Sequence, residues 1–148
     1  MHVSGRCLCG HVNFTAEIDP AKVIVCHCTD CQRNSSTAFG TVVGVVDERF
    51  TLETGDLKTY VKTADSGTKR ALKFCPECGT RVYAKTLGEG TQFMGLRVGT
   101  LDQRAELVPA AQAYTRSAAP WLGRLAEIPA YEGSLAGSPI FAGDAETE

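Results

Sequence analysis

The chain has 148 residues, of which 43% are hydrophobic, and this length and composition predict one globular domain with a core of its own. The formal net charge is −2, from 15 basic and 17 acidic residues, which disfavours a nucleic-acid partner because such proteins usually carry a basic face. No apolar stretch is long enough to span a membrane and no signal peptide is visible. We therefore expect a cytoplasmic protein with reduced thiols and no membrane partner.

Two closely spaced cysteines lie near the start of the chain. Cys7 and Cys9 are two residues apart, so on an extended strand both sulfurs would point to the same side and could face one metal ion. Residues 11–18 then alternate between apolar and polar, which predicts a half-buried strand. The residues expected on its buried face are Val12, Phe14, Ala16 and Ile18.

A second cysteine cluster follows a short apolar strand predicted at residues 23–25. Cys26 and Cys28 repeat the two-residue spacing, and Cys31 can return to them if the chain bends after Cys28. Residues 32–37 are polar and predict a loop or a single helical turn. The pattern brings three thiols together at the end of a strand.

Apolar and β-branched runs predict further strands, separated by glycine-containing turns. The predicted strands cover residues 38–46, 50–53, 57–63, 68–74, 80–85 and 93–100. Cys75 and Cys78 lie in the turn between two of them, with Pro76 and Gly79 as turn-forming residues. This arrangement is typical of a zinc knuckle, and the fold class that we predict is all-β, as small β-sheets with a zinc knuckle.

The C-terminal part carries less pattern. Residues 119–122 are expected to start a short helix. Residues 133–148 are small, polar and acidic, and we expect a flexible tail there. The predicted domain therefore covers residues 1–132.

The seven cysteines divide as two plus three plus two. The two pairs make four thiolates, the number that a closed zinc site needs, and the remaining three make the incomplete set of a zinc site with an open coordination position. The odd number disfavours a disulfide framework. Iron in place of zinc stays open, because sulfur-only tetrahedral sites accept both metals, and a second zinc ribbon without chemistry is the alternative for the middle cluster.

With these residues in view, the chain resembles the glutathione-dependent formaldehyde-activating enzyme family, which also includes centromere protein V. The motifs that carry the resemblance are GRCLCGHVNF at residues 5–14, CHCTDC at 26–31 and KFCPECGT at 73–80. The resemblance covers roughly residues 4–133 and implies an all-β zinc fold, similar to that of a Rab accessory protein. In the loop after the third cysteine of the middle cluster, this chain has Ser36 where many relatives carry glycine.

The resemblance also implies roles for the cysteines. The structural zinc set of the family matches Cys7, Cys9, Cys75 and Cys78. The catalytic zinc set, in which the fourth position is free, matches Cys26, Cys28 and Cys31. The implied reaction is the condensation of glutathione with formaldehyde to S-(hydroxymethyl)glutathione, which is a carbon–sulfur lyase reaction with glutathione as co-substrate.

Two alternatives remain beside this enzyme. One is a non-enzymatic zinc-stabilised binding module, although all three middle cysteines are present and no basic extension exists. The other is an enzyme for a different small thiol or aldehyde. The glutathione-binding residues are unassigned, with Arg33, Lys69, Arg70 and Lys73 as open candidates for its carboxylates. A homo-oligomer is possible, because the apolar run at residues 38–46 could supply either a dimer strand or the core.

Overall fold

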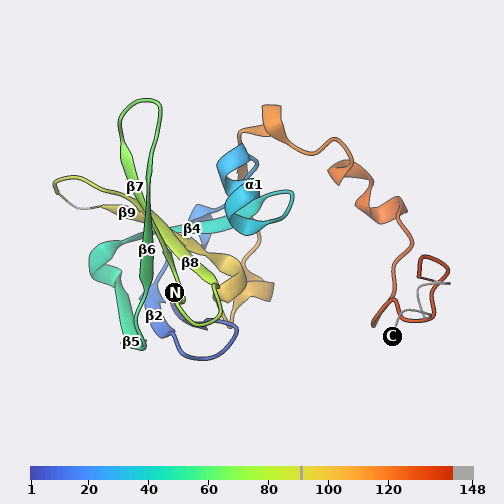
Figure 1. Ribbon diagram of the computed structural model, residues 1–148, viewed down its shortest axis with the longest axis horizontal. Helices are drawn as coiled ribbons and strands as arrows, with labels where there is room; N and C mark the ends of the chain where they lie inside the picture. The colour runs from blue at the N-terminus through green and yellow to red at the C-terminus, as the bar shows by residue number, and fades with distance from the viewer. Residues whose placement is uncertain (91, 142–148) are drawn as a thin grey trace. The chain divides into compact units, whose positions relative to one another are not determined.

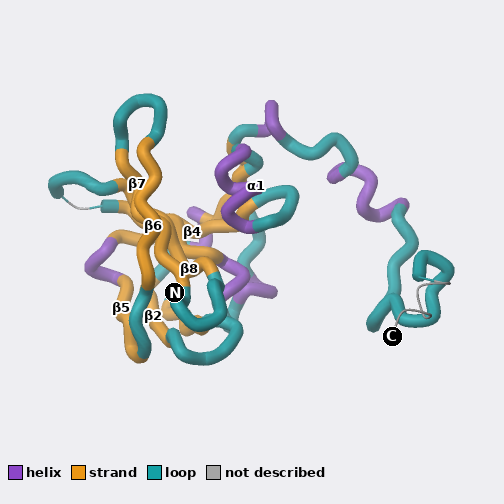
Figure 2. Tube along the Cα trace, viewed as in Figure 1, coloured by secondary structure: helices purple, strands orange, loops and turns teal. Residues whose placement is uncertain are grey.

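The computed structural model describes residues 1–90 and 92–141, and strands are its main regular structure, as Figure 2 shows. The chain divides into two units, Met1–Ala118 and Ala119–Glu148. The strands all lie in the first unit, and the regular structure described in the second is one 3-10 helix, Leu122–Glu127, where a short helix was expected. The predicted domain boundary after residue 132 stays a prediction, and residues 142–148 of the predicted tail lie outside the described residues.

The described part of the chain contains ten strands, one α-helix and six 3-10 helices. The first five strands are β1 (His2–Arg6), β2 (Asn13–Glu17), β3 (Val23–Cys26), β4 (Gly40–Val46) and β5 (Phe50–Thr54). The others are β6 (Lys58–Thr63), β7 (Lys69–Phe74), β8 (Arg81–Thr86), β9 (Phe93–Arg97) and β10 (Ala111–Ala113). The helix α1 covers Thr29–Ser35, and further 3-10 helices cover Pro20–Lys22, Asp47–Arg49, Val98–Thr100, Arg104–Glu106 and Thr115–Ser117.

The strands form two sheets (Figure 1). The smaller sheet has the order β1-β2-β5 and is antiparallel. The larger sheet has the order β10-β3-β4-β9-β8-β7-β6, in which the β10–β3 pair is parallel and the other pairs are antiparallel. The mostly β fold confirms the predicted fold class. Strands β1 and β10 are additional to those predicted.

The core is formed by apolar side chains, many of them alternate residues along the strands. The expected buried face of β2 is confirmed, since Val12, Phe14, Ala16 and Ile18 are all less than 5% exposed. The ring of Phe14 packs on Phe50 with centroids 5.2 Å apart, and Phe50 packs on Tyr83 of β8 at the same distance. This row of rings links the smaller sheet to the larger one.

Two segments differ from the sequence prediction in ways that shape the site. The segment after Cys28 is an α-helix that starts at Thr29, earlier than the predicted loop or turn at residues 32–37. Strand β9 ends at Arg97, because the chain turns into the 3-10 helix Val98–Thr100, whereas the prediction extended the strand to residue 100. Among the described residues, no helix is both long and apolar enough to cross a bilayer.

Candidate functional site

The first and last cysteine pairs meet in one cluster, although they are far apart in the sequence. Cys7 and Cys9 follow strand β1, and Cys75 and Cys78 lie in the turn between β7 and β8. Their four sulfurs all lie within 4.8 Å of one another. The sulfur of Cys9 is 3.6 Å from that of Cys7 and 3.8 Å from that of Cys75. We call this group the four-cysteine cluster.

The turn between β7 and β8 has the form that its sequence predicts. Gly79 adopts a left-handed conformation with φ of 75°, and its backbone N–H donates to the carbonyl of Cys75 over 2.9 Å. The hydroxyl of Thr80 lies 3.1 Å from the sulfur of Cys78, and the backbone N–H of Leu8 donates to the same hydroxyl oxygen over 3.1 Å. Thr80 therefore connects the two halves of the cluster.

The distances in the four-cysteine cluster fit a tetrahedral metal ion. With a zinc–sulfur bond of about 2.3 Å, the sulfurs of a tetrahedral site lie about 3.8 Å apart. The hydrogen bond from Thr80 lowers the pKa of Cys78 to about 5. The backbone N–H of His11 favours the thiolate of Cys9, but burial and the neighbouring sulfurs outweigh it and raise the pKa of Cys9 to about 12. Four adjacent thiolates repel one another, so a divalent cation is what allows all four to ionise.

The remaining three cysteines form a second cluster where β3 meets α1. Cys26 is the last residue of β3, Cys28 is the N-cap of α1, and Cys31 lies in its first turn. The backbone N–H of Cys31 donates to the sulfur of Cys28 over 3.2 Å, so the helix start itself holds these two residues together. The three sulfurs lie within 4.8 Å of one another. We call this group the three-cysteine cluster.

No fourth cysteine, histidine or carboxylate joins the three-cysteine cluster within the described part of the chain. His27 is adjacent in sequence, but it is 2% exposed and its Nε2 lies 2.7 Å from Oε1 of Gln112 on β10. Burial and the sulfurs of Cys26 and Cys28 raise the pKa of Cys31 to about 12. The donor set fits a metal ion with three sulfur ligands and one free position.

A cavity of about 420 Å³ opens onto the three-cysteine cluster. This volume lies in the range of small-molecule sites. Its wall is partly apolar, with Ile24, Val42, Leu72 and Ala84 beside the sulfurs. Arg70 and Lys62 also line it, and Lys62 forms an ion pair with Asp30 of α1. Of the four basic residues left open for glutathione, Arg70 is the one that lines this cavity. We call it the cysteine cavity.

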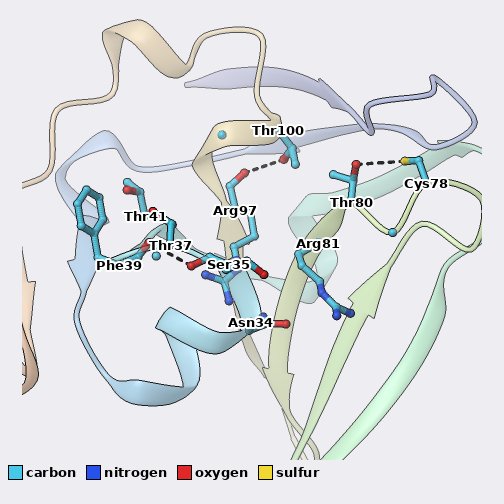
Figure 3. A pocket seen from close by; sticks show the side chains of 14 residues that line it. Asn34, Ser35, Thr37, Phe39, Thr41, Cys78, Thr80, Arg81, Arg97 and Thr100 are labelled. Carbon is cyan, nitrogen blue, oxygen red and sulfur yellow. Dashed lines mark hydrogen bonds between the residues drawn. The ribbon is translucent and has the colours of Figure 1, made fainter. Parts of the chain in front are cut away.

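A second cavity of about 610 Å³ adjoins the cysteine cavity. Figure 3 shows hydroxyl-bearing side chains around it, together with Arg81 and Arg97. Asn34 and Arg97 line both cavities. No local sequence pattern indicates a role for Arg97, because its place beside the cysteines depends on the pairing of β9 with β4, in which Arg97 lies opposite Val42. We call it the hydroxyl cavity.

Comparison with known proteins identifies the relatives of this chain. The sequence model described as glutathione-dependent formaldehyde-activating enzyme matches residues 2–117. A crystal structure of a Rhodobacter sphaeroides protein superimposes with a TM-score of 0.58 at 18% identity, over 74% of this chain and 99% of the other. This likeness shows a shared fold. No protein in the curated collection matches.

Proposed function

The chain belongs to the glutathione-dependent formaldehyde-activating enzyme family, and on that premise we propose that it is a zinc-dependent carbon–sulfur lyase that forms or breaks a thiol–aldehyde adduct. The proposed reaction joins glutathione and formaldehyde to S-(hydroxymethyl)glutathione. One sulfur–carbon bond forms and the thiol proton ends on the former carbonyl oxygen, so no further reactant is needed. The proposed location is the cytoplasm.

The observation that carries this proposal is the open set of three sulfurs facing a cavity. Cys26, Cys28 and Cys31 would hold the catalytic zinc ion, and Cys7, Cys9, Cys75 and Cys78 a structural one. Zinc held by three thiolates supplies a free position at which a thiol binds and loses its proton at neutral pH. A closed structural site has no use for a ligand-sized cavity, whereas an enzyme needs one beside its metal.

The other residues of the cysteine cavity have roles that follow from their chemistry. The apolar part of the wall leaves room for a small aldehyde beside the cysteines. The exposed ion pair between Lys62 and Asp30 connects β6 to the first turn of α1, which carries Cys31. Tyr114 lines the cavity from the end of β10 with a left-handed φ of 57°, and the guanidinium of Arg116 lies 5.2 Å from its ring centre. These contacts position the cavity wall around the reacting groups.

The test combines metal content with turnover. The reduced protein should hold about two zinc ions per chain, or one that rises to two when glutathione is added. Formation of S-(hydroxymethyl)glutathione, followed by NMR exchange spectroscopy, should be faster than the uncatalysed reaction. Cys28→Ser should lose the second zinc ion and return the rate to the uncatalysed one. The neighbouring, exposed Thr29→Ser serves as the matched control and should retain both.

Two outcomes would contradict the proposal. If Cys28→Ser leaves both zinc content and turnover unchanged, the three-cysteine cluster is not the catalytic site. If the protein holds one zinc ion whatever thiol is added, and adds nothing to the uncatalysed rate, a zinc-stabilised binding module replaces the enzyme. Turnover with another small thiol or aldehyde in place of glutathione and formaldehyde would keep the reaction class and change the substrate.

A further inference from the structure

Arg97 is a buried cation whose position the proposed metal sites do not explain. It is the last residue of β9 and is 9% exposed. Its Nη1 atom is buried and finds no hydrogen-bond partner among the described residues. A buried donor without a partner destabilises the folded protein, and a buried guanidinium does so more than a neutral group. Such a group points to a ligand that supplies the missing acceptor.

The backbone beside Arg97 makes room for its guanidinium. A Cβ atom at Gly40 would lie 2.3 Å from Nη1 of Arg97 and 3.5 Å from Cβ of Cys31. The guanidinium therefore occupies space that any other residue at position 40 would fill, and it lies next to the three-cysteine cluster. A ligand group bound to Arg97 would therefore lie beside the three-cysteine cluster.

The hydroxyl cavity, onto which Arg97 opens, is suited to an anion. Its lining contains a second arginine, Arg81, whose guanidinium lies 4.6 Å from the ring centre of Phe74, and Cys78 of the four-cysteine cluster, but no aspartate or glutamate among the described residues. Six hydroxyl-bearing residues line it, most of them labelled in Figure 3. The hydroxyls of Ser35 and Thr100 donate to backbone carbonyls and that of Thr80 contacts the sulfur of Cys78, which leaves those of Ser36, Thr37 and Thr41 as donors for a ligand. Guanidinium groups bind carboxylates through paired N–H donors, and hydroxyls add further hydrogen bonds.

We propose that Arg97, with Arg81, binds a carboxylate of the thiol substrate in the hydroxyl cavity while the thiol reaches the three-cysteine cluster. This inference rests on the proposed function for the identity of the thiol, but its test measures binding and not turnover. A simpler role for Arg97, neutralising the thiolates, predicts no preference for ligand carboxylates.

The experiment compares two ligands. S-methylglutathione keeps both carboxylates and cannot ionise at sulfur, and its dimethyl ester lacks both carboxylate charges. In isothermal titration calorimetry on the zinc-loaded full chain, the ester should bind the unchanged protein at least about tenfold more weakly than S-methylglutathione does. Arg97→Gln should weaken binding of S-methylglutathione by about 10- to 100-fold, and Arg97→Lys by less. Arg33→Gln, an exposed arginine of α1 outside both linings, should bind within about twofold of the unchanged protein.

The comparison of acid and ester needs no substitution, so it decides the question even if Arg97→Gln fails to fold. Equal binding of the acid and the ester would overturn the carboxylate site, as would unchanged binding in Arg97→Gln. Absence of any binding of S-methylglutathione at millimolar concentration would overturn it too. If the protein binds the ester more weakly than the acid but shows no turnover, the carboxylate site is supported and the proposed lyase activity is contradicted. The two proposals can therefore fail separately.

Discussion

Gly40 is the residue through which the proposed role of Arg97 can be tested without touching Arg97. A Cβ atom at Gly40 would lie 2.3 Å from the guanidinium Nη1, whereas a Cβ at Gly44, also on β4, meets nothing within 4 Å among the described residues. Because Nη1 is the end of a flexible side chain, Gly40→Ala should displace the guanidinium and cost the fold no more than about 1 kcal/mol. We expect Gly40→Ala to bind S-methylglutathione about tenfold more weakly by calorimetry.

Gly44→Ala is the matched control, since it adds the same methyl group to the same strand. It should leave both the dissociation constant and the thermal midpoint close to those of the unchanged protein. If the two alanine variants bind S-methylglutathione equally well, the placement of the Arg97 guanidinium does not matter for binding. The prediction and the carboxylate site would then both be wrong.

At the scale of single elements, helix α1 shows where sequence reasoning fell short. Its seven residues have no apolar periodicity, so the sequence predicted a loop or a single helical turn at residues 32–37. The helix forms because the sulfur of Cys28 accepts the N–H of Cys31, as a serine or aspartate side chain would at other helix starts. A cysteine acting both as N-cap and as predicted metal ligand is not recognised by rules based on oxygen caps.

The end of α1 gives a prediction that concerns the whole element. Ser36 is its C-cap, with a left-handed φ of 56°, a conformation that favours glycine. Ser36→Gly should therefore raise the free energy of unfolding by about 0.5–1 kcal/mol and the thermal midpoint by about 2 °C. Ser35→Gly should do the opposite, by about 1 kcal/mol or more. Ser35 is the last residue of the helix, and its hydroxyl donates to the carbonyl of Cys31 over 2.7 Å.

Differential scanning calorimetry of these two variants measures both effects in the same experiment. The two stability changes should have opposite signs, because glycine relieves backbone strain at Ser36 but has a lower helix propensity than serine at Ser35. A loss of stability in Ser36→Gly would mean that the serine side chain contributes more than the backbone conformation costs.

Most of the other elements follow from local patterns, and the exceptions have physical reasons. Strands β2 to β9 coincide with alternating or β-branched runs, so their positions could be predicted within a few residues. Strand β10 is three residues long and exists because it pairs in parallel with β3, with Ala113 opposite Cys26. Likewise, cysteine spacing predicted the two clusters, whereas Arg97 reaches them only through the register of β9 against β4. Long-range pairing is not encoded in a local pattern.

At the scale of the whole molecule, the four-cysteine cluster connects distant parts of the fold. Cys7 and Cys9 follow the first strand of the smaller sheet, and Cys75 and Cys78 belong to a hairpin of the larger one. Cys9 and Cys75 are 66 residues apart in the sequence. A metal ion there would close a long loop, whereas a metal ion on the three-cysteine cluster would close only the short one from residue 26 to 31.

Loop length therefore predicts different stability effects for the two clusters. By the entropy of loop closure, a cross-link of the longer loop contributes about 4 kcal/mol to the free energy of unfolding, and one of the shorter loop about 2 kcal/mol. We expect the double variant Cys75→Ser/Cys78→Ser, which leaves ligands at only one end of the longer loop, to lower the thermal midpoint about twice as much as Cys28→Ser, in reducing buffer with zinc. Circular dichroism at the β-sheet band measures both midpoints. Equal losses, or a larger loss in Cys28→Ser, would mean that the four-cysteine cluster is not what joins the two sheets, and that the row of aromatic rings formed by Phe14, Phe50 and Tyr83 is sufficient.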